Sequence, residues 1–127
     1  MATTGLDPEV ARRVADLLEL ARQNQIETRV TSTRRSRAEQ ERLYRAWLGR
    51  GKKGLPAAFP GTSTHEFGFA VDIVSSAPAA LGRLAECVGL KWAGPKDPVH
   101  FDVWGPAAWR QLLQDRPLPA GFSYTCR

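Results

Sequence analysis

The chain has 127 residues, 43% of them hydrophobic, and a chain of this length can bury one core in a single domain. Its formal net charge of +5 is concentrated between residues 29 and 53, where nine Lys or Arg accompany only Glu39 and Glu41. There is neither a run of roughly 20 apolar residues nor the basic head and apolar stretch of a signal peptide, so we expect one soluble domain over residues 1–127, made in the cytoplasm.

The first half of the chain predicts a helix, a strand and a second helix. Asp7 and Pro8 are typical of a helix start, and apolar residues then recur at helical spacing to about Gln23. Residues 26–33 are rich in β-branched side chains and predict a strand. Ser36 and Glu39 form the pattern of a capping box, which predicts a helix to Gly49 with an apolar face that includes Trp47 and Leu48.

The second half predicts a loop followed by short strands and helices. Residues 49–62 contain too many Gly and Pro for regular structure, and we expect a mobile loop. Strands are predicted at 69–74, 90–92 and 99–104, and helices at 78–88 and 106–113. Because helices and strands do not alternate strictly, we predict an α+β fold, a small antiparallel sheet flanked by helices.

Two cysteines are too few for a disulfide scaffold, and neither has a second sulfur at the spacing of a metal finger. We expect Cys87 to be a small buried apolar residue and Cys126 to be a thiol near the C-terminus.

The chain has only two histidines, and both lie in short segments that contain an acid. His65 precedes the predicted strand that carries Asp72, and Gly68 between them would let backbone approach a metal closely. His100 begins a later strand, and antiparallel pairing could place it alongside Asp72. Two imidazoles and one carboxylate are the usual protein ligands of a catalytic zinc, so His65, Asp72 and His100 are candidate ligands.

A second acid, Asp97, lies three residues before His100. In metal-assisted hydrolysis one carboxylate holds the metal while another takes a proton from water and returns it to the leaving amine. This division favours Asp72 as the ligand and Asp97 as the base. A structural zinc site would use the same residues, although it would more often be closed by a fourth protein ligand.

These residues together resemble the zinc D-alanyl-D-alanine carboxypeptidase and endopeptidase family, which includes VanY-like and VanX-like enzymes and the L-alanyl-D-glutamate endopeptidases of phage lysis. The shared pattern is Ser63-x-His65-x-x-Gly68-x-Ala70-x-Asp72 followed by Asp97-x-x-His100. The resemblance covers about residues 26–104 and implies a hedgehog/DD-peptidase-like fold. It also implies the zinc ligands His65, Asp72 and His100, with Asp97 as the general base.

Further site residues follow from the same resemblance. Residues 32–36 are similar to a Ser-Gly-Tyr-Arg-Ser segment of the family, so Arg35 matches the arginine that holds a substrate carboxylate or polarises the scissile carbonyl. Gln40 lies in the helix that follows, and Ser63 matches a position at the substrate pocket. The resemblance therefore implies that Arg35, Gln40 and Ser63 contact the peptidoglycan stem peptide.

Two departures from the family pattern are informative. The carboxypeptidase branch usually carries glutamate as the base and tryptophan before the second histidine, whereas this chain has Asp97 and Val99. Aspartate here resembles the phage endolysin branch, which favours cleavage of the L-Ala–D-Glu bond after release from the cytoplasm. Thr33 and Arg34 replace the glycine and tyrosine of the upstream segment, which leaves substrate contacts there open.

Two other functions remain open at this level. The chain could be a D-Ala-D-Ala carboxypeptidase, or a non-catalytic binding module that zinc stabilises. The basic segment at 29–53 could concentrate the protein on an anionic cell wall or could simply be a solvated surface. It contains no motif typical of nucleic-acid readers, so we expect a monomer that binds the stem peptide and no nucleic acid.

Overall fold

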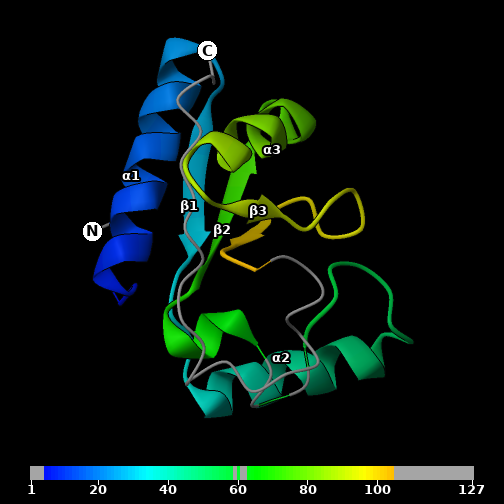
Figure 1. Cartoon of the computed structure of the whole chain (residues 1–127). Coiled ribbons are helices and arrows are strands. Elements are labelled where there is room, and N and C mark those ends of the chain that lie inside the picture. The colour runs from blue at the N-terminus through cyan, green and yellow to red at the C-terminus, as the bar shows by residue number, and fades with distance from the viewer. Residues whose placement is uncertain (1–4, 59, 61–62, 105–127) are drawn as a thin grey trace.

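A four-stranded antiparallel sheet forms the centre of the computed structural model, which describes residues 5–58, 60 and 63–104 (Figure 1). The strands lie in the order β1-β2-β4-β3, with the bounds β1 Thr28–Ser32, β2 Ala70–Ser75, β3 Lys91–Trp92 and β4 His100–Asp102. All neighbouring strands in this sheet are antiparallel. The predicted α+β class with a small antiparallel sheet is therefore confirmed.

Within the described ranges, the helices are α1 (Pro8–Gln23), α2 (Arg37–Gly49), α3 (Pro78–Cys87) and the 3-10 helix η1 (Thr64–Phe67). Helix α1 begins as predicted, because the Asp7 carboxylate accepts hydrogen bonds from two backbone N–H groups of the first turn. The Ser36 hydroxyl accepts from the backbone N–H of Glu39 at the start of α2. The Glu39 carboxylate pairs with Arg42, so the predicted capping box is formed only in part.

The hydrophobic core lies between one face of the sheet and the helices α1 and α3. Val14 and Leu17 of α1 and Leu81 of α3 are completely buried in it, together with Val71 of β2 and Phe101 of β4. Val71 and Phe101 are directly opposite each other in the β2–β4 ladder. Because side chains alternate along a strand, the neighbouring residues of both strands face the other side of the sheet.

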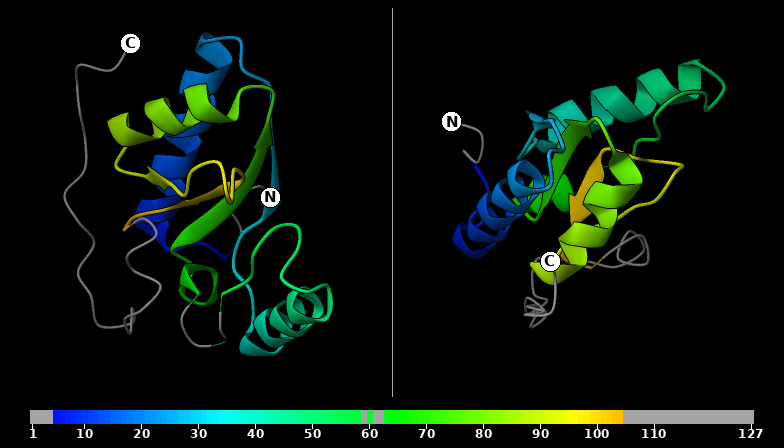
Figure 2. Two further views of the ribbon diagram at one scale, coloured as in Figure 1. Left: turned by 90° about the vertical axis from the view of Figure 1, so that its right-hand side faces the viewer. Right: turned by 90° about the horizontal axis from the view of Figure 1, so that it is seen from above.

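Helix α2 lies apart from α1 and α3, beyond the end of the sheet, in Figure 1 and in the left-hand view of Figure 2. Gln40 is its one buried residue, and Leu48 is 42% exposed. Leu48, which the sequence assigned to the apolar face of this helix, is therefore exposed to solvent. Leu43 and Trp47 instead line a pocket that is described below.

Gly68 ends η1 in the left-handed conformation, with φ of 77°. A Cβ atom at this position would lie 2.9 Å from the carbonyl oxygen of Gly5 and 3.0 Å from the backbone nitrogen of Asp7. Gly68 is thus required by its left-handed backbone conformation and by the N-terminal segment that packs against it. The η1 turn itself was not expected from the sequence, which predicted only a loop before β2.

Cys87 at the end of α3 is buried, as expected, but it is disulfide-bonded, which the sequence did not lead us to expect. Cys126 and the helix predicted at 106–113 lie outside the described residues. None of the helices within the described ranges is both long and apolar enough to cross a membrane.

Candidate active site

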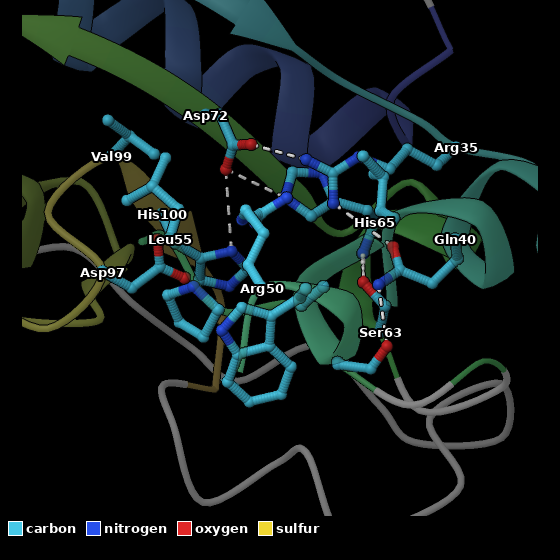
Figure 3. A pocket seen from close by; sticks show the side chains of 15 residues that line it. Arg35, Gln40, Arg50, Leu55, Ser63, His65, Asp72, Asp97, Val99 and His100 are labelled. Atoms are coloured by element: carbon cyan, nitrogen blue, oxygen red, sulfur yellow. Dashed lines mark hydrogen bonds and ion pairs between the residues drawn. The ribbon is translucent and has the colours of Figure 1, made fainter. Parts of the chain in front are cut away.

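The two central strands and η1 bring the predicted metal ligands together. Asp72 of β2 is directly opposite His100 of β4, as the sequence predicted, and both lie on the face of the sheet opposite to Val71 and Phe101. His65 reaches the same place from η1. Figure 3 shows both histidines and Arg35 converging on the Asp72 carboxylate.

The geometry of these three residues fits a tetrahedral zinc ion. The Oδ1 atom of Asp72 lies 3.0 Å from Nε2 of His65 and 3.7 Å from Nδ1 of His100, and the potential ligand atoms all lie within 4.8 Å of one another. Zn–N bonds of about 2.0–2.1 Å place neighbouring tetrahedral ligands roughly 3.3–3.4 Å apart. Within the described residues the group has three members, which leaves a fourth position for water or substrate.

The hydrogen bonds of His65 favour a metal at this place. Its Nδ1 lies 2.7 Å from the carbonyl oxygen of Thr33, which can only accept a proton, so Nδ1 carries the hydrogen. Burial lowers the pKa of His65 and keeps the ring neutral, although the neighbouring Asp72 acts in the opposite direction. The lone pair of Nε2 then faces a carboxylate oxygen at 3.0 Å, an arrangement that a cation between the two atoms stabilises.

His100 is oriented by Asp102, a residue that the sequence did not reveal, and its two ring nitrogens have the opposite roles to those of His65. Its Nε2 lies 2.7 Å from Oδ2 of Asp102, which is completely buried and also accepts hydrogen bonds from the Thr64 hydroxyl and the Trp104 backbone. The Nε2–H therefore donates to Asp102, and Nδ1 faces Asp72. A carboxylate that orients a ligating histidine is a common feature of zinc sites. Strand alternation, which puts residues 100 and 102 on one face, was the signal that could have revealed it.

The two candidate acids differ in electrostatic environment. Burial raises the pKa of Asp72, but the neighbouring His100 and His65, with Arg35 nearby, more than offset this and hold the pKa far below its usual range. Burial raises the pKa of Asp97 to about 6, and the carboxylates of Asp72 and Asp102 act in the same direction against the lowering by His100. Asp72 thus stays ionised, as a ligand must, while Asp97 is poised to exchange a proton near neutral pH.

Arg35 and Gln40 form a supporting network behind Asp72. The Nη2 of Arg35 lies 2.6 Å from Oδ2 of Asp72, and its Nη1 donates to Oε1 of Gln40 at 3.2 Å. The amide nitrogen of Gln40 donates to the carbonyl oxygen of Ala58 at 2.8 Å. Both ends of this fully buried amide therefore have partners in the protein, and Gln40 connects Arg35 to the segment before η1.

Ser63 caps η1 and so orients His65. Its hydroxyl oxygen accepts from the backbone N–H of His65 at 3.2 Å, and the Glu66 carboxylate accepts in return from the Ser63 N–H at 3.2 Å. Arg37 of α2 pairs with this nearly buried Glu66. The capping box thus fixes the start of η1, one residue before the ligand.

All of the predicted site residues line one cavity of about 390 Å³, a volume suitable for a small ligand. They share it with Leu43 and Trp47 of α2, with Arg50 directly after this helix, and with the segment 55–58. The sequence placed Leu43 and Trp47 in a helix and Arg50 in the loop that follows, but only the structure shows that they form the pocket wall.

Solved structures with a similar fold include a D,D-pentapeptidase and an L-Ala D-Glu endopeptidase. The chain is 22% identical to VanYB in complex with D-alanine-D-alanine, with a TM-score of 0.68, covering 83% of this chain and 75% of that one. It is 21% identical to a mutant of the D,D-pentapeptidase VanY from a VanB-type resistance cassette, in complex with Zn(II), with a TM-score of 0.64 and coverage of 84% and 79%. The L-Ala D-Glu endopeptidase ChiX of Serratia marcescens is 21% identical, with a TM-score of 0.59 and coverage of 79% and 81%.

No curated protein sequence matches the chain. A family model described as VanY, D-alanyl-D-alanine carboxypeptidase, matches residues 3–92, which include His65 and Asp72. This family is zinc-dependent and acts on peptidoglycan, in agreement with the two histidines and the aspartate that converge here. The chain therefore belongs to the VanY family of D-alanyl-D-alanine carboxypeptidases.

Proposed function

We propose that this protein is a zinc peptidase that cuts the stem peptide of peptidoglycan, at the bond between L-Ala and D-Glu. The observation that carries the proposal is the convergence of His65, Asp72 and His100 in one pocket with Asp97, an acid outside the ligand group and with a raised pKa. A single chain supplies the ligands and the base.

Asp97 is the proposed general base. Zinc, when it is bound, polarises water and the scissile carbonyl as a Lewis acid. The Asp97 carboxylate takes a proton from the attacking water as the new C–O bond forms and the carbonyl electron pair moves onto oxygen. When the C–N bond breaks, Asp97 returns this proton to the departing amine nitrogen. The carboxylate is the competent form, so activity falls as the pH drops through the pKa of Asp97.

Arg35 has two proposed roles. Its contact with Oδ2 of Asp72 keeps the ligand ionised and oriented, and its permanent charge at the pocket wall favours the oxygen on which negative charge develops. Gln40 holds the arginine in this position. We propose that the Ser63 hydroxyl, which accepts from the His65 backbone, donates its own hydrogen to the substrate.

The L-Ala–D-Glu bond is proposed as the cleavage site because of the length of the Asp97 side chain. Asp97 is one methylene shorter than the glutamate usual in the carboxypeptidase branch, and it resembles the base of the endolysin branch. We propose an endolysin-like role in cell-wall degradation on this ground. The second candidate is a D-Ala-D-Ala carboxypeptidase, which the description of the matching family model favours.

Digestion of purified peptidoglycan tests the proposal. Zinc-loaded protein should release fragments with new N-terminal D-Glu, identified by mass spectrometry, and chelated protein should release none. Loss of terminal D-Ala alone would instead establish the carboxypeptidase. Zinc binding without any new termini would leave only a binding module.

The Asp97→Asn variant separates the base from the ligands. Its hydrolysis rate should fall on the order of 10²–10⁴-fold, because general-base catalysis contributes about this much. Its zinc content should remain unchanged, because the ligand group does not include Asp97. Near-native hydrolysis by this variant would remove Asp97 from the mechanism.

A further inference from the structure

Helix α2 contributes one continuous wall to the active-site pocket. Gln40, Leu43, Trp47 and Arg50 follow one another at spacings of three, four and three residues, so they share one face of the helix. Gln40, at the N-terminal end of this wall, contacts Arg35. Arg50 lies just after the last residue of the helix, and Figure 3 shows it in the same pocket as Asp97 and His100.

Arg50 differs from the other arginines near this helix in having no carboxylate partner among the described residues. Arg37 pairs with Glu66, Arg42 with Glu39 and Arg45 with Glu41. Arg35, before the helix, pairs with Asp72. The Nε of Arg50 donates to the backbone carbonyl of Lys53 at 3.2 Å, which orients the guanidinium without neutralising it.

The wall beside Arg50 is mainly apolar and carries one buried donor that has no acceptor among the described residues. Leu43, Leu55 and Pro56 contribute apolar side chains to the pocket. The indole N–H of Trp47 is buried and has no acceptor in the described part of the chain, and an unpaired buried donor of this kind is destabilising. This part of the pocket therefore offers an apolar surface and a cation, and its polar groups are not fully satisfied by the protein itself.

We infer that Arg50 is a specificity-determining residue that binds a free carboxylate of the stem peptide, the α-carboxylate of the D-Glu residue. The inference rests on the proposed function, because it concerns the substrate of the same pocket. A guanidinium matches a carboxylate with two parallel N–H donors, and such a charge-assisted contact is stronger than one to a neutral amide. A peptide in which this carboxylate is amidated loses the ion pair but keeps nearly the same shape.

Two synthetic pentapeptides test this directly. One is L-Ala-γ-D-Glu-L-Lys-D-Ala-D-Ala, and the other carries D-isoglutamine in place of D-Glu. Zinc-loaded wild-type protein should hydrolyse the acid with a kcat/KM roughly tenfold higher than the amide, mainly through KM, since charged hydrogen bonds are worth this much or more. The Arg50→Gln variant should lose the preference, and Arg50→Lys should restore part of it.

Arg45→Gln is the matched control, because it removes the same charge from the same helix at a position outside the pocket. This control should keep the wild-type preference. Equal rates on acid and amide with the wild type, or a preference that survives Arg50→Gln, would overturn the inference.

The same peptides distinguish failure of the inference from failure of the proposed function. Hydrolysis of the L-Ala–D-Glu bond or of the D-Ala–D-Ala bond in either peptide shows that the protein is a stem-peptide hydrolase, independently of the role of Arg50. If neither peptide is hydrolysed, the proposed function fails, and calorimetric titration of both peptides into the zinc-loaded protein still decides the role of Arg50. Tighter binding of the acid by wild type but not by Arg50→Gln supports the inference, and equal binding rejects it.

Discussion

Asp102 shows how a single residue away from the pocket can control the site. It is completely buried beneath His100 and accepts hydrogen bonds from that ring, from Thr64 and from Trp104. Because its carboxylate holds the hydrogen on Nε2, the Nδ1 lone pair of His100 is left to face the proposed metal.

We therefore predict that Asp102→Asn lowers zinc affinity about 10- to 100-fold, the usual effect of removing such a partner. Competition with a chromophoric chelator measures this. Asp16→Asn, on the exposed face of α1, is the control and should bind zinc as the wild type does. Denaturant unfolding of both chelated variants separates lost affinity from lost fold, and an unchanged zinc affinity in Asp102→Asn would contradict the prediction.

At the scale of elements, the short helix η1 places His65 through constraints at both of its ends. Ser63 and Glu66 form a capping box at its start, and Gly68 ends it in a left-handed conformation. The backbone N–H of Asp7 donates to the Gly68 carbonyl at 2.9 Å, so the start of α1 and the end of η1 hold each other in place. The chain thereby connects the core helix α1 to the proposed metal ligand His65.

Gly68→Ala should therefore destabilise the protein by about 1–3 kcal/mol, the usual cost of a strained backbone position. A Cβ atom here meets only backbone atoms, which have little freedom to move. Gly49→Ala is the matched control: this glycine ends α2, and a Cβ there meets nothing within 4 Å. Guanidinium unfolding monitored by circular dichroism should show a lower free energy of unfolding for Gly68→Ala and an unchanged one for Gly49→Ala. Equal unfolding midpoints for the two variants would show that position 68 does not require glycine.

At the scale of the whole molecule, one face of the sheet forms the hydrophobic core and the other forms the candidate site. Val71 and Phe101 bury one face against α1 and α3, while Asp72 and His100 on the other face form the site. The site therefore buries ionisable groups at the centre of the fold. Burial lowers the pKa of His100, but the hydrogen bonds to Asp102 and Asp72 more than offset this and raise it to about 9 in the metal-free protein.

This raised pKa predicts how the stability of the metal-free protein depends on pH. The contribution of protonated His100 is complete below the unfolded pKa of about 6.5 and is lost as the pH rises through about 9. Chelated protein should therefore lose on the order of 1–3 kcal/mol between pH 7 and pH 9. Zinc binds the neutral ring, so its stabilising effect should increase over the same range.

Denaturant unfolding of chelated protein at several pH values measures this loss. Chelated His100→Gln should show little change between pH 7 and pH 9, because the titrating group is gone. If the chelated wild type keeps constant stability across this window, His100 does not carry the proton assigned to it.

The sequence by itself determined the order of most elements and the identity of the proposed ligands, because both depend on local patterns. The caps Asp7 and Ser36, the alternation along β2 and the His65 and His100 segments are all visible in short stretches of chain. Even the pairing of Asp72 with His100 follows from antiparallel alignment of two strands.

Only the tertiary structure decided the environment of these groups, because it depends on contacts between distant segments. Thr33 fixes the ring of His65 from 32 residues away, and Arg35 reaches Asp72 across 37 residues. The raised pKa of Asp97 comes from burial. The role of α2 as a pocket wall ending in Arg50 likewise follows from how that helix lies against the site, which local periodicity does not specify.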